Sequence, residues 1–152
     1  MPKHKALLVF AIKAPFVIGV YEEYELIDTI ISEEAKASDI LPPLLCELCD
    51  KHLPDELFFV DGPGNLMSLK VAFVALKTIS VLKNIPLAGA DAFHFNGKKA
   101  LKISNKLIFE KQNDKISLAK EACDTAEMSM PQRLKRQIFD TSATPRYILS
   151  AV

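Results

Sequence analysis

The 152-residue chain contains 49% hydrophobic and 25% charged residues, a composition that is typical of globular proteins and excludes an intrinsically disordered chain. At this length we expect one domain with one core, and a second unit can be only partial. The formal net charge is zero, so the chain as a whole gives no support to nucleic-acid binding by phosphate neutralisation.

Charge is distributed unevenly along the chain. Residues 1–76 contain 6 Lys or Arg and 12 Asp or Glu, whereas residues 77–152 contain 13 and 7. Two interpretations stay open. The halves can form solvated faces of opposite charge, or the basic half can present a surface that positions an RNA or an acidic partner.

Cysteine content and hydropathy indicate the compartment. The three cysteines are an odd number in a chain long enough to be stabilised by its core, so we expect a reducing, cytoplasmic location rather than a disulfide framework. Lys13, Lys70 and Lys77 interrupt the apolar stretches before any reaches the roughly 18–20 residues that span a bilayer. No membrane segment is expected.

Three apolar runs of strand length open the chain, at residues 5–12, 16–21 and 24–31. The connections between them, at 13–15 and 22–23, are short enough for hairpins. This opening therefore predicts an antiparallel meander.

A first helix is predicted where leucines recur with helical spacing at positions 41, 44, 45 and 48, in a segment that runs to about His52. Pro42 and Pro43 are tolerated in the first turn of a helix but not further in. We therefore expect the helix to begin close to them, with Ser38 as a candidate cap.

The middle of the chain alternates between strands and helices. A short buried strand is predicted at 57–60, a Gly-rich loop at 61–65, a long helix at 66–83 that ends at Asn84, and another buried strand at 86–90. A meander followed by such alternation predicts a mixed sheet with helices packed on it, an α/β architecture.

The periodicity is weaker after residue 97. We expect a hairpin at 100–103 and 107–109, short helices at 117–127 and 131–139, and a last strand at 147–149. Because this part is short, polar and basic, we expect an N-terminal lobe over residues 1–96 and a reduced C-terminal lobe over residues 97–152.

The predicted helix at 66–83 has two nearly opposite apolar faces, and one sheet cannot cover both. The first face consists of Leu69, Ala72, Phe73 and Leu76. Either the second face meets another protein, or the helix that begins near Pro42 covers it. The second face and the polar seam beside it supply the candidate partner-binding residues: Met67, Lys70, Val71, Val74, Lys77, Thr78 and Val81.

Gly62, Pro63 and Gly64 form the loop before this helix, where free backbone N–H groups and the helix dipole can bind an anion. The loop is either a phosphate site or a structural turn. Pro63 lacks an N–H, and Asp61 would repel a phosphate unless a metal intervened, so the structural turn is favoured.

No metal or catalytic site is indicated. Cys46, Cys49 and His52 fall on one helical stripe, but structural zinc takes four ligands and the sequence indicates no fourth. His4 and His94 have no Ser, Cys or carboxylate partner that the sequence establishes. We therefore predict no metal, no cofactor and no catalytic residue.

Several segments, in matching order, resemble the TsaB (YeaZ-like) family. Residues 59–72, which contain Asp-Gly-Pro-Gly-Asn at 61–65, resemble the family's G-x-G-P-G-S-F-T-G-L-R-x-G, and Ile-Pro-Leu-Ala-Gly at 85–89 resembles G-I-P-L-x-G. Ser-Asp-Ile-Leu-Pro-Pro-Leu at 38–44 is similar to H-S-E-x-L-L-P-x-I, and Pro-Arg-Tyr-Ile-Leu at 145–149 is similar to P-x-Y-L-R. The resemblance is strongest over residues 36–92, extends to 5–31, and is poor over 97–140.

The resemblance implies an actin/Hsp70-like (ribonuclease-H-like) fold with a truncated second lobe. It also implies a non-catalytic scaffold whose helical face dimerises or binds a TsaD-type ATPase, joined by a TsaE-type ATPase, in threonylcarbamoylation of the tRNA adenosine beside the anticodon. The tRNA would then be bound indirectly. Two alternatives stay open: a small ATP-dependent phosphotransferase or peptidase of the same fold, and direct tRNA binding through the basic half.

The chain departs from the family pattern at four positions. Lys13 stands where the family's first strand ends in Asp, Val60 replaces the first glycine, and Met67 and Ser68 replace Thr-Gly. These departures weaken a nucleotide-binding role more than an interface role.

Overall fold

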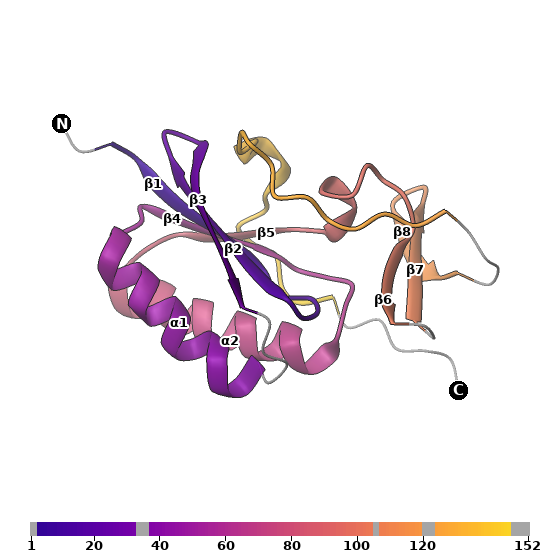
Figure 1. Ribbon diagram of the computed structural model, residues 1–152, viewed down its shortest axis with the longest axis horizontal. Coiled ribbons are helices and arrows are strands. Elements are labelled where there is room, and N and C mark those ends of the chain that lie inside the picture. Colours follow the sequence, from indigo (N-terminus) through magenta and orange to yellow (C-terminus); the bar gives the residue numbers. More distant parts are fainter. Residues whose placement is uncertain (1–2, 33–36, 105–106, 120–123, 147–152) are drawn as a thin grey trace.

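The computed structural model describes residues 3–32, 37–104, 107–119 and 124–146 of the chain. A five-stranded sheet lies at its centre, with two helices on one face and a three-stranded sheet beyond one end (Figure 1). The strands of the large sheet are β1 (Lys5–Phe10), β2 (Phe16–Glu22), β3 (Glu25–Ser32), β4 (Glu56–Val60) and β5 (Leu87–Ala90).

The large sheet is mixed, with the spatial order β3-β2-β1-β4-β5. β1, β2 and β3 pair antiparallel, whereas β4 is parallel to β1 and β5 is parallel to β4. Glu23 and Tyr24 join β2 to β3 with φ values of 53° and 64°, as a two-residue hairpin turn requires. The predicted meander and the predicted mixed sheet are confirmed.

Successive side chains of the central strand β1 enter two separate cores. Leu7 and Val9 pack with the two helices, while Leu8 and Phe10 pack with the chain that follows β5. This period of two explains the nearly unbroken apolar run, because a strand that is buried on both faces has no polar side.

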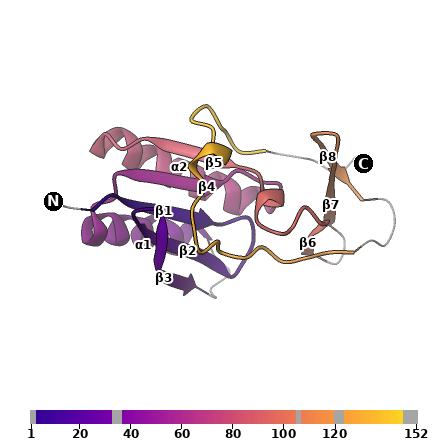
Figure 2. The same cartoon turned by 90° about the horizontal axis from the view of Figure 1, so that it is seen from above.

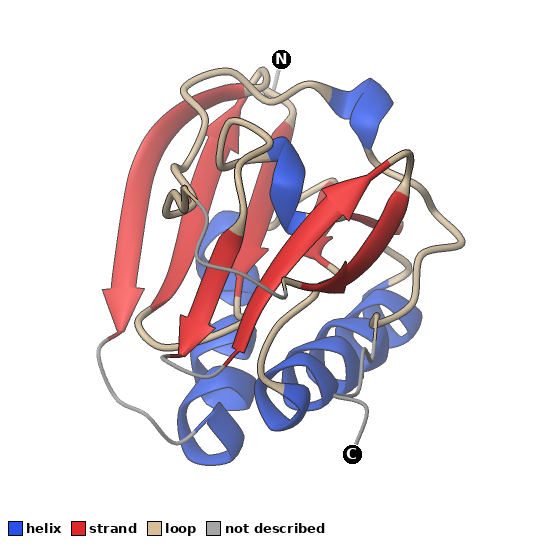
Figure 3. Cartoon of the chain, turned by 90° about the vertical axis from the view of Figure 1, so that its right-hand side faces the viewer, coloured by secondary structure: helices blue, strands red, loops and turns tan. Residues whose placement is uncertain are grey.

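The two helices, α1 (Ala37–His52) and α2 (Leu66–Lys83), lie side by side on the same face of the large sheet (Figures 1 and 3). α2 has the predicted bounds. The side chain of Asn65 caps its first turn, and Asn84 ends it in the left-handed conformation at φ 55°. Over the described residues, no helix is both long enough and apolar enough to cross a membrane.

The predicted start of α1 is wrong, because the helix begins at Ala37 and places Pro42 and Pro43 in its second turn. Ser38 therefore lies at the second position of the helix rather than at the predicted position before it. Each proline removes one helical N–H donor. Leu41 and Leu45 are fully buried on either side of the two prolines, so packing on the sheet stabilises both turns.

The small sheet follows β5 and a short 3₁₀ helix, η1 (Ala92–His94). Its antiparallel strands are β6 (Leu101–Ser104), β7 (Leu107–Gln112) and β8 (Lys115–Leu118). The predicted hairpin is confirmed, but the predicted helix at 117–127 is wrong over its described part, because β8 occupies its start and residues 124–127 are not helical.

Residues 124–146, which we call the return segment, run back across the face of the large sheet opposite α1 and α2 (Figure 2). Their only helix is η2 (Arg136–Ile138), so the predicted helix at 131–139 is wrong. The backbone bonds instead to both edges of the sheet: Leu134 N donates to Tyr24 O at 2.8 Å, and Gly89 and Asp140 exchange two hydrogen bonds of 2.9 Å. The predicted strand at 147–149 lies outside the described residues.

Some of the opposite charges of the two halves form ion pairs with each other. Arg133, Arg136 and Arg146 of the return segment pair with acidic residues of the first half. The partners are Glu25 at 3.1 Å, Glu56 at 2.9 Å and Asp61 at 2.8 Å, in that order. Part of the opposite charge therefore joins the return segment to the large sheet, an arrangement that neither sequence interpretation included.

Candidate functional site

An open groove lies between α1 and α2, on the outer side of the helix layer. It has a volume of about 540 Å³, and most of its lining is apolar. Pro42 and Cys46 form the α1 wall. The α2 side consists of Met67, Lys70, Val71, Val74, Ala75, Thr78, Ile79 and Leu82.

The groove exists because α2 is apolar on both sides. Leu69, Ala72 and Leu76 are buried in the core. On the other side, Met67 is 63% exposed and Leu82 is 78% exposed. Large exposed apolar side chains that lie together on one element are typical of an interaction surface.

The alternative that α1 covers the second face of α2 is confirmed in part, whereas contact with another protein stays a prediction. Val71 and Ala75 are half-buried against the core that α1 helps to form, so α1 covers this portion of the face. Met67, Val74 and Val81 remain 63%, 55% and 69% exposed. The uncovered portion is the part that is free to contact another molecule.

Five of the seven candidate partner-binding residues line the groove: Met67, Lys70, Val71, Val74 and Thr78. Lys77 and Val81 are exposed on α2 but lie outside the lining. Sequence reasoning missed Leu82, although it follows Val74 and Thr78 at intervals of four residues and so continues their row along the helix.

The two helices differ in charge beside the groove. α1 has the exposed carboxylates Glu47 and Asp50 and the exposed ammonium of Lys51, while α2 has the exposed ammonium groups of Lys70 and Lys77, of which only Lys70 lines the groove. At the far end of the groove, Lys83 Nζ donates to Asp50 Oδ1 at 2.9 Å and links the two helices. A binding partner would therefore meet a mostly apolar lining in which Lys70 is the charged residue.

The loop before α2 is packed inside the protein. Gly62, Pro63 and Gly64 are all buried, and Asn65 N donates to Ile12 O at 2.7 Å. A Cβ on Gly64 would lie 2.5 Å from Ile12 Cβ, so only glycine allows this approach. Tight packing therefore accounts for the glycine at 64.

Asp61, directly after β4, is the most buried carboxylate of this region, at 1% exposed. Burial raises its pKa to about 6, although the Arg146 guanidinium, which donates from Nε to Oδ1 at 2.8 Å, opposes the rise. Its backbone N–H also donates to Ala90 O at 2.9 Å. Asp61 thus serves to hold the return segment against the ends of β4 and β5.

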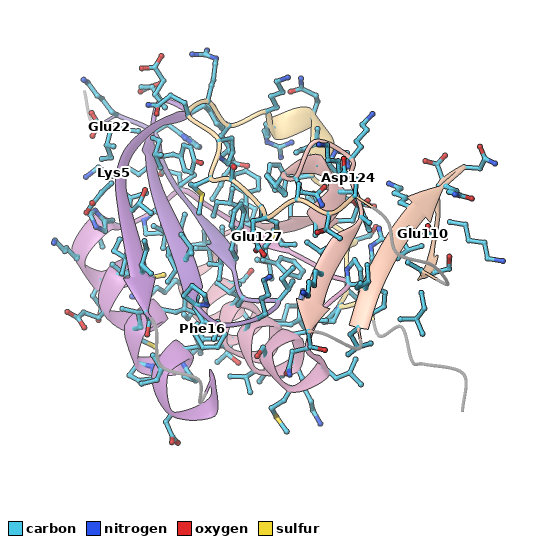
Figure 4. All side chains as sticks on the ribbon, turned by 45° about the vertical axis from the view of Figure 1, so that its right-hand side comes forward. Lys5, Phe16, Glu22, Glu110, Asp124 and Glu127 are labelled. Carbon is cyan, nitrogen blue, oxygen red and sulfur yellow. The ribbon has the colours of Figure 1, made fainter. Side chains whose placement is uncertain are left out.

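Lys13, which follows β1, joins the two sheets. Its ammonium donates to Lys102 O at 2.8 Å and pairs with Glu127 at 2.8 Å (Glu127 is labelled in Figure 4). At the position where the family resemblance leads one to expect an aspartate, this chain therefore has a cation that is bonded to the small sheet and to the return segment.

The stripe of Cys46, Cys49 and His52 on α1 is divided between core and surface. Cys46 is exposed, whereas Cys49 is fully buried, and burial raises the pKa of its thiol to about 11. Burial also lowers the pKa of His52. Within the described ranges, no group of three or more His, Cys, Asp or Glu side chains is arranged to hold a metal ion.

Comparison with known proteins identifies the fold. No protein-family model matches the chain, and no curated protein sequence does so either. YeaZ from Pseudomonas aeruginosa matches it with a TM-score of 0.52 and 14% sequence identity, over 84% of this chain and 71% of YeaZ. The chain has the YeaZ fold. This confirms the expected actin/Hsp70-like (ribonuclease-H-like) fold class, and it confirms the resemblance to the YeaZ-like family at the level of the fold.

A second solved structure agrees. It is described as an uncharacterized protein with similarity to peptidase YeaZ from Pseudomonas aeruginosa, and it matches with a TM-score of 0.51 and 14% identity. The match covers 78% of this chain and 64% of that protein. The chain thus spans about two thirds of the length of the YeaZ-like proteins that it matches.

Proposed function

We propose that the chain is a non-catalytic member of the TsaB (YeaZ-like) family, and that its groove between α1 and α2 binds a TsaD-type ATPase. In this role it supports threonylcarbamoylation of the tRNA adenosine next to the anticodon. The observation that carries the proposal is the apolar groove of about 540 Å³ between α1 and α2, two helices within residues 36–92, where the sequence resemblance is strongest. The YeaZ fold supports it further.

The groove suits an amphipathic helix of the partner, which would place apolar side chains at intervals of three and four residues along α2. Full burial of one large apolar side chain is worth roughly 1.5–3 kcal/mol. Met67, Val74 and Leu82 are 63%, 55% and 78% exposed, so a partner that covers them removes most of their remaining contact with water. Their combined burial then contributes on the order of 4 kcal/mol, about a thousandfold in affinity.

Charge in the groove would help to select the partner. Lys70, which lines the groove, favours an acidic residue of the partner opposite it. A second copy of this chain, turned by a two-fold axis, would present the same apolar lining to the groove. A homodimer through this groove is therefore the competing occupant of the same surface.

The remaining parts of the proposal follow from the family. A TsaE-type ATPase joins the complex, the tRNA is bound by the partner rather than by this chain, and the complex works in the cytoplasm without a cofactor on this chain. Residues 97–152 serve as a reduced C-terminal lobe. Lys13 and Asp61 support a non-catalytic role, because each already has a partner within the chain. No separate observation favours a phosphotransferase or a peptidase.

The test is complex formation between this chain and the TsaD-type ATPase of the same organism, measured by light scattering after size exclusion and by calorimetry. Val74→Glu and Leu82→Glu place a charge in the groove and should weaken the complex at least about tenfold. Ile27→Glu is the matched control, since Ile27 is 52% exposed on β3, away from the groove. Wild-type affinity in both groove variants would contradict the proposal, as would the absence of a complex at micromolar concentrations with TsaE and ATP present.

A further inference from the structure

A cavity of about 290 Å³ lies on the side of the large sheet away from α1 and α2. Its lining comes from Asp91, η1, the turn after η1, the end of β7 and the turn between β7 and β8. Its lining includes Asp91, Phe93, His94, Lys98, Lys111 and Asp114. Its volume is at the lower end of the roughly 300–1,000 Å³ that small-molecule sites occupy, so a compact ligand is expected.

Asp91, the most buried charged residue of this cavity, forms an ion pair with Lys111 in the cavity wall. Asp91 is 5% exposed, and its Oδ1 accepts from Phe93 N at 3.0 Å while its Oδ2 accepts from Lys111 Nζ at 2.7 Å. Both carboxylate oxygens are therefore engaged. The ammonium of Lys111 has two further hydrogens, for which the described residues provide no acceptor.

Two further donors line the same cavity. Lys98 is exposed, and its ammonium is absent from the ion pairs of the described residues. His94 is 33% exposed at its side chain, and its Nε2 lies 3.9 Å from Asp91 Oδ2, beyond hydrogen-bond distance. Lys98, Lys111 and His94 therefore offer hydrogen-bond donors that no described acceptor saturates.

His94 also lines a second cavity, of about 170 Å³, together with residues of the return segment. Its basic residues are Lys135 and Arg133, which is paired with Glu25 at 3.1 Å, and Phe95, Leu134 and Ile138 supply an apolar wall. Arg133 is paired with Glu25 and Lys111 with Asp91, so Lys98, Lys135 and Asp114 leave the two linings a net charge of +1 with His94 counted as neutral. The combined lining therefore favours a ligand with negative charge and a small apolar part.

We propose that these two cavities bind a small phosphate monoester. Its phosphoryl group accepts hydrogen bonds from Lys98, Lys111 and His94, and the charged ammonium donors of the two lysines form strong hydrogen bonds to phosphate oxygens. Its organic part lies in the second cavity, against Leu134 and Ile138. The site is separate from the groove between α1 and α2, so the proposal does not depend on the proposed function.

The experiment is a titration of the full-length chain with phenyl phosphate and, separately, with inorganic phosphate, followed by calorimetry and by backbone amide NMR. We expect saturable binding of phenyl phosphate, with the amide shifts concentrated around His94, Lys98 and Asp114. Inorganic phosphate should bind more weakly, because it leaves the second cavity empty. Equal affinity for the two probes would overturn the assignment of the organic part.

Variants separate a built site from general surface charge. Lys98→Met should weaken binding about three- to tenfold. Asp114→Asn removes an anion from the lining and should strengthen binding, whereas Lys115→Met, an exposed lysine outside the lining, should leave it unchanged. Circular dichroism checks that each variant is folded. The proposal is overturned if phenyl phosphate does not saturate at millimolar concentration, or if the two lysine variants weaken binding equally.

Discussion

Replacement of Arg146 by Met should destabilise the protein in a pH-dependent way, because it removes the ion-pair partner of a buried carboxylate. Asp61 is 1% exposed, and Arg146 Nε donates to its Oδ1 at 2.8 Å. Methionine retains the apolar part of the arginine side chain but has neither its charge nor its donors. In the variant, Asp61 must therefore remain charged without a partner or bind a proton.

The sign follows from the two pKa values of Asp61. Burial raises its pKa from 3.8 to about 6 in the folded protein, so between about pH 4 and pH 6 the folded state binds more protons there than the unfolded chain. The contribution of Asp61 to stability is therefore greatest below pH 4 and is lost as the pH rises to 6. This rise in pKa corresponds to about 3 kcal/mol at neutral pH.

Without Arg146 the folded-state pKa of Asp61 rises further. In the variant, the unfolding free energy therefore continues to fall as the pH rises above 6. We expect the variant to lose about 1–3 kcal/mol of unfolding free energy near pH 8 and much less near pH 4.5, where Asp61 is protonated in both folded proteins. The assay is urea unfolding followed by circular dichroism at both pH values.

Arg133→Met is the matched control. Its partner Glu25 is 66% exposed at the side chain and Arg133 is 70% exposed, so removal of this pair should cost less than about 1 kcal/mol at either pH. An equal loss of stability at the two pH values for Arg146→Met would refute the reasoning, because the effect would then not depend on the charge of Asp61.

Three further predictions concern local contacts. Asn65→Ala removes the cap hydrogen bond of α2 and should cost about 1 kcal/mol in urea unfolding, whereas an unchanged midpoint would contradict the capping role. Gly64→Ala places a Cβ 2.7 Å from Ile12 O and should cost about 1–3 kcal/mol, measured by thermal melting; an unchanged melting temperature would show that the loop relaxes. Cys46, which is exposed, should react with iodoacetamide much faster than buried Cys49, whose thiol has a pKa of about 11. Mass spectrometry measures the two rates, and equal rates would contradict this difference in exposure.

Local signals were sufficient for the long helix and for the strands of the large sheet. Asn84 and Pro86 mark the end of α2, and the apolar runs of the first three strands have lengths and connections that fit only a meander. The start of α1 was harder to predict. The prolines favour a start beside them, and only the burial of Leu41 against the sheet explains why the helix extends further back.

The return segment could not be predicted from spacing. Leu134 and Ile138 are four residues apart, as on a helix, but the segment is mostly irregular because its backbone bonds to β3 and β5 and Phe139 packs on Phe58 with ring centroids 4.4 Å apart. These contacts join residues that are far apart in the sequence. Tertiary pairing therefore overrides a weak local helix preference.

The candidate groove was predictable on one side only. The apolar period of α2 identifies Met67 and Val74 without any structure, and the same period could have included Leu82. Pro42 and Cys46 line the opposite wall because α1 lies beside α2, which the sequence left as one of two alternatives. Likewise, nothing near Lys13 in the sequence predicts its pairing with Glu127.

The most direct test of the proposed interface uses Cys46, which is exposed and lies in the wall of the groove. The wild-type chain is treated with a thiol-alkylating reagent, alone and with a saturating amount of the TsaD-type ATPase, and the rate of modification at Cys46 is followed by peptide mass spectrometry. A partner that occupies the groove should slow the modification of Cys46 at least about tenfold. In the control, an unrelated protein at the same concentration should leave the rate unchanged. Unchanged reactivity of Cys46 in a complex that does form would place the interface elsewhere and contradict the account.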